Sequence, residues 1–133
     1  VLFRSIKSLL AQEKIYIHAD KTCTKPGTRH YINASDVASA VLFLMSNFVS
    51  GQKYNIVGNR EVSNLDLALE ISKIMNKDLN YELVDFHSSR PGHDLRYALC
   101  GEKMKELGWE PKLDLRKGLE EVISWYTSNE GWL

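Results

Sequence analysis

The stretch Arg90-Pro91-Gly92-His93-Asp94-Leu95-Arg96-Tyr97 places two arginines, a histidine and an aspartate around a Pro-Gly corner. Proline fixes its own φ angle and favours an extended conformation at the residue before it, and glycine allows backbone angles that other residues resist. The polar side chains therefore meet where the backbone is stiff and then bends. Arginine offers a planar fork of N–H donors that matches the oxygens of a phosphate. The stretch predicts an anion-binding loop; the alternative is a solvated surface loop with a local Arg–Asp ion pair.

Helical patterns alternate with short strand patterns on both sides of this stretch, which predicts an α/β fold that is rich in helix and has short strands. We expect strands at 15–18, 53–57 and 81–86. We expect helices in the first ten residues and at 36–48, 63–75, 102–108 and 114–126. Ser63 and Asp114 are expected to be N-caps, and Gly108 is expected to end a helix in the left-handed conformation.

The helix expected at 36–48 carries apolar residues on nearly every face, so we expect neighbouring elements to cover it on most sides. Trp109 and Trp125 lie at a helix end and on an apolar stripe, respectively. Both are therefore predicted to fill the core rather than to stack on a ligand.

Composition limits the class of protein. A chain of 133 residues with 44% hydrophobic content is the usual size for one domain, so we expect residues 1–133 to form a single domain. The 17 basic and 17 acidic residues balance, which gives no global attraction to nucleic acid or to a membrane. No apolar run has the length of a membrane span, and there is no signal-peptide pattern. Two cysteines without metal-type spacing and four scattered histidines predict a cytoplasmic protein without a zinc site.

Four blocks carry motifs that extend over nearly the whole chain. They are Ile15-Tyr16-Ile17 with Thr28-Arg29-His30-Tyr31-Ile32 and Asp36-Val37-Ala38; Tyr54-Asn55-Ile56-Val57-Gly58 with Ser63-Asn64-Leu65; the stretch from Arg90 to Ala98 with Leu107-Gly108-Trp109-Glu110-Pro111; and Leu119 to Tyr126. In this order they resemble the C-terminal part of the NAD-dependent nucleotide-sugar epimerases and dehydratases, which are extended short-chain dehydrogenase/reductases. The Arg-Pro-Gly-His-Asp form is most similar to the 4,6-dehydratases of dTDP-glucose.

The resemblance implies four substrate-binding residues: Arg29, Asn64, Arg90 and His93. In the family, the residues that match Arg29 and Arg90 hold the nucleoside diphosphate of a dTDP-, UDP- or GDP-linked sugar. For Arg29 the alternative is a structural ion pair with Asp36 or Asp20. Asn64 would contact the nucleotide or cap its helix, and His93 would contact ribose or phosphate or only order the loop.

The resemblance also implies the chemistry of a longer parent enzyme. There NAD⁺ would oxidise the sugar at C4; a 4,6-dehydratase would then eliminate water across C5 and C6, whereas a 4-epimerase would return the hydride to the other face of C4. The chain has neither the Gly-x-x-Gly-x-x-Gly loop that binds the dinucleotide nor the Tyr-x-x-x-Lys pair of the family. We therefore expect a fragment detached from a Rossmann-type N-terminal domain, with no catalytic residue and no cofactor bound by this chain. A non-catalytic nucleotide-binding or interaction module is the remaining alternative.

Two further expectations follow from the resemblance. His30 stands where the family usually has an aspartate, which changes the surroundings of Arg29. In the family the strand that matches 54–57 joins a large parallel sheet, and the helix from Asp36 covers that sheet. Without that sheet, an unpaired strand edge and a bare apolar helix predict self-association, most simply as a twofold homodimer that pairs these strands or swaps the N-terminal helix. The alternative is a monomer whose N-terminal helix folds back over the bare surface.

Overall fold

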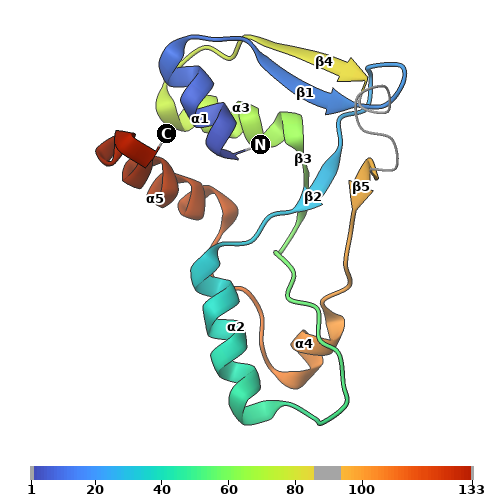
Figure 1. Cartoon of the computed structure of the whole chain (residues 1–133). Helices are drawn as coiled ribbons and strands as arrows, with labels where there is room; N and C mark the ends of the chain where they lie inside the picture. The colour runs from blue at the N-terminus through green and yellow to red at the C-terminus, as the bar shows by residue number, and fades with distance from the viewer. Residues whose placement is uncertain (1, 86–93, 133) are drawn as a thin grey trace.

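The computed structural model describes residues 2–85 and 94–132, and they form a helix-rich α/β fold with short strands (Figure 1). In chain order the elements are α1 (Leu2–Ala11), β1 (Ile15–Ala19), β2 (Thr28–His30), α2 (Ala34–Asn47), β3 (Glu61–Ser63), α3 (Asn64–Met75), β4 (Tyr81–Asp85), β5 (Arg96–Tyr97), α4 (Glu102–Leu107), α5 (Leu115–Ser128) and the 3-10 helix η1 (Glu130–Trp132).

The strands form two small sheets. β1 and β4 pair in parallel from Ile15 opposite Tyr81 to Ala19 opposite Asp85. The second sheet has the order β3-β2-β5, in which β2 runs antiparallel to β3 and parallel to β5. β2 is therefore the central strand, and both of its backbone edges are paired.

The main hydrophobic core lies between α1, α3, α5 and β1, in the upper layer of Figure 1. Each helix contributes the apolar stripe that its sequence pattern predicts, and β1 contributes its alternate residues. The buried members are Ile6, Leu9, Ile15, Ile17, Leu67, Ala68, Ile71, Leu119 and Ile123.

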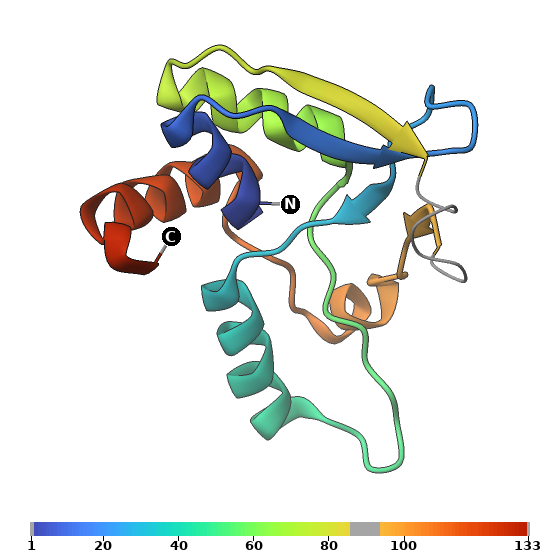
Figure 2. The same cartoon turned by 45° about the horizontal axis from the view of Figure 1, so that its top comes forward.

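A second, smaller core joins α2 to α4 below that layer (Figure 2). Ala40, Met104 and Trp109 are its buried members, and the Trp109 indole Nε1 donates a hydrogen bond to Ser39 Oγ at 2.9 Å. The buried carboxylate of Asp36 accepts hydrogen bonds from the backbone N–H groups of Lys112 and Leu113. These polar contacts fix the segment that leads into α5 against the start of α2.

The predicted helix ends are confirmed where a local signal marks them. Ser63 Oγ accepts from the backbone N–H of Asp66, and Asp114 accepts from the N–H of Arg116 in the same way. Gly108 has φ 106°, the left-handed conformation that a glycine adopts without strain. The prediction that Trp109 fills the core is also confirmed, because it is 6% exposed.

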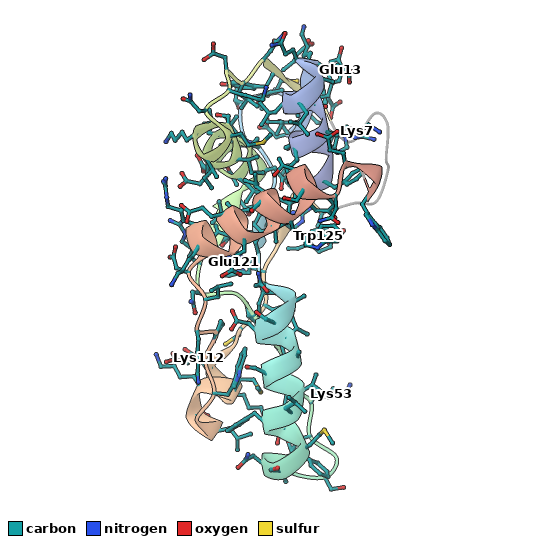
Figure 3. All side chains as sticks on the ribbon, turned by 90° about the vertical axis from the view of Figure 1, so that its left-hand side faces the viewer. Lys7, Glu13, Lys53, Lys112, Glu121 and Trp125 are labelled. Atoms are coloured by element: carbon teal, nitrogen blue, oxygen red, sulfur yellow. The ribbon has the colours of Figure 1, made fainter. Side chains whose placement is uncertain are left out.

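Three expectations from the sequence are wrong. Residues 53–57 form no regular strand; the segment packs Tyr54 and Ile56 against the second core, but none of the described strands pairs with it. α2 is not covered on most sides, since Leu42 is 66% and Met45 71% exposed. Trp125 lies on the outer side of α5 and is 48% exposed (Figure 3).

Among the described glycines, Gly58 has the least room for a side chain. A Cβ atom at this position would lie 1.9 Å from the carbonyl oxygen of Tyr31. Only a residue without a side chain can pass there, so Gly58 lets the chain that leads to β3 run against the end of β2.

Within residues 2–85 and 94–132, no helix combines the length and the apolar composition that crossing a membrane requires.

Candidate anion-binding site

Arg29 lies in the middle of β2, and backbone carbonyls of β2 and of the segment before β5 hold its guanidinium. Its Nη1 donates to the carbonyl oxygens of Thr28 and Leu95, the second at 3.0 Å. The guanidinium carbon also lies 4.1 Å from the centroid of the Tyr97 ring, a cation–π distance. These contacts orient the guanidinium. Its Nε makes no hydrogen bond to any described residue.

Asn64 is the first residue of α3 and is 6% exposed. Its backbone N–H donates to the carbonyl oxygen of Gly27 at 2.8 Å, and its Oδ1 accepts the hydroxyl of Tyr31 at 2.5 Å. Because Ser63 caps the helix, the Asn64 side chain is not used as a cap. Its Nδ2 makes no hydrogen bond to any described residue.

Gly27 brings Arg29 and Asn64 to a common point. A Cβ atom built on Gly27 would lie 3.0 Å from the carbonyl oxygen of Leu95, 3.3 Å from Asn64 Nδ2 and 3.7 Å from Arg29 Nη1. Arg29 Nη1 already donates to the Thr28 and Leu95 carbonyls, so the NH₂ group of Asn64 and the positive charge of the guanidinium are what this point offers to a ligand. An amide donor beside a guanidinium suits an anionic acceptor such as a phosphate.

The opposite face of the same sheet carries a polar network centred on Glu61. Arg96 donates to the two carboxylate oxygens of Glu61 at 2.7 and 2.8 Å, and the Thr28 hydroxyl donates to the first of them. The hydrogen bonds from Arg96 and then Thr28 lower the pKa of Glu61 to about 2. The network ties both outer strands to β2 and so steadies the strand that carries Arg29.

The structure brings Arg29 and Asn64 together, whereas Arg90 and His93 lie outside the described residues. The alternative partners of Arg29 are occupied elsewhere. Asp36 binds backbone groups before α5, and Asp20 accepts from Thr22, Thr24 and Lys25 within its own loop. Neither forms the ion pair with Arg29 that would make its role purely structural.

His30 lies opposite Glu61 on the neighbouring strand. Its Nδ1 is buried and has no hydrogen-bond partner among the described residues. His30 also lowers the pKa of Glu61, with a smaller effect than Arg96 and Thr28. The histidine thus contributes to the Glu61 network.

The start of α3 does not have the features of a dinucleotide-binding turn. The first turn of α3 follows the antiparallel strand β3 without a glycine-rich turn, and Asp66 places a negative charge where a pyrophosphate would bind. Within the described ranges, no group of three or more His, Cys, Asp or Glu side chains could hold a metal.

Several residues of the site are not apparent from the sequence. Gly27, Tyr31 and Glu61 carry no local signal for an anion site, because their contacts join segments that are far apart in the chain. Arg96 is visible within the Arg90–Tyr97 stretch, but its partner Glu61 lies 35 residues away. A pattern read along the chain gives no information on such a pair.

The chain is similar in sequence to curated dTDP-glucose 4,6-dehydratases. It is 35% identical to the dTDP-D-glucose 4,6-dehydratase of Bos taurus over 134 residues, which cover 97% of this chain and 36% of that protein. It is 34% identical to dTDP-glucose 4,6-dehydratase 1 of Escherichia coli K12 over 111 residues, or 79% of this chain and 31% of that protein. The chain thus spans about a third of the length of these relatives. No family model matches it.

Solved structures give the same result. The dTDP-glucose 4,6-dehydratase of Bacillus anthracis, determined in complex with NAD, superimposes with a TM-score of 0.83 and 31% identity, covering 98% of this chain and 40% of the other. The UDP-N-acetylglucosamine 4-epimerase of Methanobrevibacter ruminantium, determined with UDP-N-acetylmuramic acid, has a TM-score of 0.81; at 20% identity this likeness shows the fold alone. By sequence and by structure, the chain matches a C-terminal part of the family of dTDP-glucose 4,6-dehydratases and related NAD-dependent epimerases.

Proposed function

We propose that this chain binds the nucleoside diphosphate part of a nucleotide sugar, as the substrate-binding part of an NAD-dependent 4,6-dehydratase. The observation that carries the proposal is that the Asn64 NH₂ group, which has no acceptor among the described residues, lies beside Gly27 next to the positively charged guanidinium of Arg29. Arg90 and His93 belong to the proposed site because of the family resemblance, and both lie outside the described residues. Charge-assisted hydrogen bonds of this kind contribute about 1.5–3 kcal/mol each.

Calorimetry with dTDP, UDP and GDP, and with sugars linked to each, tests this proposal. We expect binding that disappears in Arg29→Ala and Arg90→Ala and that is weakened in Arg29→Lys, which keeps the charge but not the fork. Arg4→Ala is the matched control, because it removes an exposed arginine from α1, away from the site. Wild-type affinity in both Arg29→Ala and Arg90→Ala would refute the site. The preferred base distinguishes a dTDP-sugar dehydratase from a UDP-sugar 4-epimerase.

We propose that the chemistry of the reaction resides outside these 133 residues. NAD supplies the hydride chemistry in such enzymes, and the groups of this chain bind and orient the substrate. The purified chain should therefore give no NAD-dependent conversion of any nucleotide sugar. Detected turnover would contradict this assignment and would require a catalytic group within the chain.

We also propose that the chain forms a twofold homodimer through the exposed face of α2. This face has apolar side chains with no described cover, and it continues into the unpaired segment at 53–57. In Figure 3, α2 extends away from the layer of α1, α3 and α5. The exposed apolar residues are Val37, Val41, Leu42, Met45, Phe48 and Val49.

Light scattering after size-exclusion chromatography over a dilution series tests the dimer. The wild type should have twice the mass of 15.2 kDa, and Leu42→Glu should shift it to the monomer. Tyr16→Glu is the control, since Tyr16 is 56% exposed on β1, away from α2. A wild-type monomer at all concentrations would end the proposal.

We propose further that residues 1–133 act as one domain in the cytoplasm. Cys23 and Cys100 are both free thiols, as a reducing compartment favours. A single thermal transition, seen by fluorescence and circular dichroism alike, would support one cooperative unit. Cell fractionation tests the location.

A further inference from the structure

Tyr31 lies next to the candidate site. Its hydroxyl contacts the amide oxygen of Asn64, whereas the amide nitrogen lies near Gly27. The hydroxyl donates to Asn64 Oδ1 at 2.5 Å. An asparagine amide has one accepting and one donating end, so a neighbour that binds the oxygen determines where the NH₂ group points. Here the NH₂ group points towards Gly27 and Arg29.

The opposite amide orientation would leave the hydroxyl proton of Tyr31 without an acceptor among the described residues. Tyr31 is partly buried, and an unpaired hydroxyl there is unfavourable, which favours the observed orientation. Burial raises the pKa of Tyr31 to about 12, so the hydroxyl keeps its proton and remains a donor throughout the physiological range. Asn64 as a whole residue is 6% exposed.

We infer that Tyr31 is a positioning residue that fixes Asn64 as a hydrogen-bond donor, so that the site admits only an acceptor such as a phosphoryl oxygen. The inference rests on the proposed function for the identity of the ligand, but the orientation of the amide is a property of the unliganded chain. β2, which precedes Tyr31, and the segment that leads into α3 lie side by side (Figure 2), so the contact joins two elements that are fixed by strand pairing.

Tyr31→Phe removes the hydroxyl and keeps the ring. The ring lines a mainly apolar cavity of about 120 Å³ between the start of α2 and α5, where phenylalanine makes the same contacts. Tyr54→Phe is the matched control, because Tyr54 packs against the second core and its hydroxyl accepts a hydrogen bond from the N–H of Val49, away from Asn64. Circular dichroism establishes that both variants fold.

The first readout needs no ligand. Nuclear magnetic resonance of the wild type should show a nuclear Overhauser effect between an Asn64 Hδ2 proton and Gly27 Hα, since Nδ2 lies 3.3 Å from the position of a Gly27 Cβ. The effect should weaken in Tyr31→Phe and persist in Tyr54→Phe. Its absence from the wild type, or its persistence in Tyr31→Phe, would overturn the inference.

The second readout is affinity for dTDP. Tyr31→Phe should bind about fivefold to tenfold more weakly than the wild type, the effect of one hydrogen bond. In an Asn64→Ala background the same substitution should change affinity by less than about twofold, because Tyr31 acts through Asn64. Wild-type affinity in Tyr31→Phe alongside a loss in Asn64→Ala would also overturn it. If the wild type binds no dTDP but shows the expected nuclear Overhauser pattern, the proposed function fails and the assigned orientation of Asn64 stands.

Discussion

Arg96 reaches across β2 and donates its Nε and Nη2 to the carboxylate of Glu61, at 2.7 and 2.8 Å. The two residues belong to the outer strands of a three-stranded sheet, so the bidentate ion pair spans the strand that carries Arg29. Arg96 is the first residue of β5, so the ion pair also fixes the start of β5 against the sheet.

Glu61→Gln should lower stability at neutral pH and leave it nearly unchanged at pH 2. The pKa of Glu61 falls from 4.5 to about 2 in the folded chain, so its stabilising effect is present above pH 4.5 and is lost as the pH falls towards 2. Thermal melts of wild type and variant between pH 2 and 7 should therefore converge at the acid end. Glu13→Gln, at an exposed residue of the loop after α1, should show no such convergence. A constant difference at all pH values would contradict the role of the charge.

Asp20→Asn should release the loop between β1 and β2. The carboxylate accepts from the backbone N–H groups of Thr24 and Lys25 at 2.8 and 3.0 Å and from the Thr22 hydroxyl. The bonds from Lys25, Thr24 and Thr22, in that order, lower the pKa of Asp20 to about 2. The amide proton shifts of Thr24 and Lys25 should titrate with a midpoint near pH 2 in the wild type and not in the variant. A midpoint near the ordinary 3.8 would mean that the loop is open in solution.

Gly58→Ala should destabilise the fold by about 1–3 kcal/mol or more, since the new methyl group would overlap the Tyr31 carbonyl oxygen. Gly131→Ala is the control, because nothing lies within 4 Å of a Cβ at that position. Urea denaturation measures both. Equal stability of the two variants would show that the approach of the chains at Gly58 is looser than described.

Trp109→Phe should cost about 1–3 kcal/mol, because it removes both core volume and the hydrogen bond to Ser39. Trp125→Phe should change stability by less than about 0.5 kcal/mol, since Trp125 is 48% exposed. Chemical denaturation of the two variants compares a buried with an exposed tryptophan. A larger loss of stability in Trp125→Phe than in Trp109→Phe would contradict the burial of Trp109 and the exposure of Trp125.

The helices of this chain are predictable from its sequence because their signals are local. Ser63, Gly108 and Asp114 mark helix ends through contacts within a few residues. The strands are less predictable, because a strand exists only where a partner pairs with it. Residues 53–57 have a strand pattern and lack that partner among the described elements. The three-residue strands β2 and β3 have the partner and no distinct pattern.

The candidate site is predictable only in part. Arg29 and Asn64 could be selected because each lies in a motif, but their approach at Gly27 depends on two strand pairings and on a helix start. Trp125 shows that residue type alone can mislead. Its apolar character predicted burial, but its position on α5 leaves it half exposed.

The parallel pairing of β1 with β4 has a consequence for how the chain folds. The neighbouring contact between Lys14 and Glu82 closes a loop of 68 residues, about half of the chain. Closing so long a loop costs entropy before any contact is gained, so this pairing should form late and limit the folding rate. Gly27 directly precedes β2 and donates its backbone N–H to the carbonyl oxygen of His18 in β1, so we expect the site to be complete only when that step has occurred. A bound nucleotide would then slow unfolding and leave the folding rate nearly unchanged.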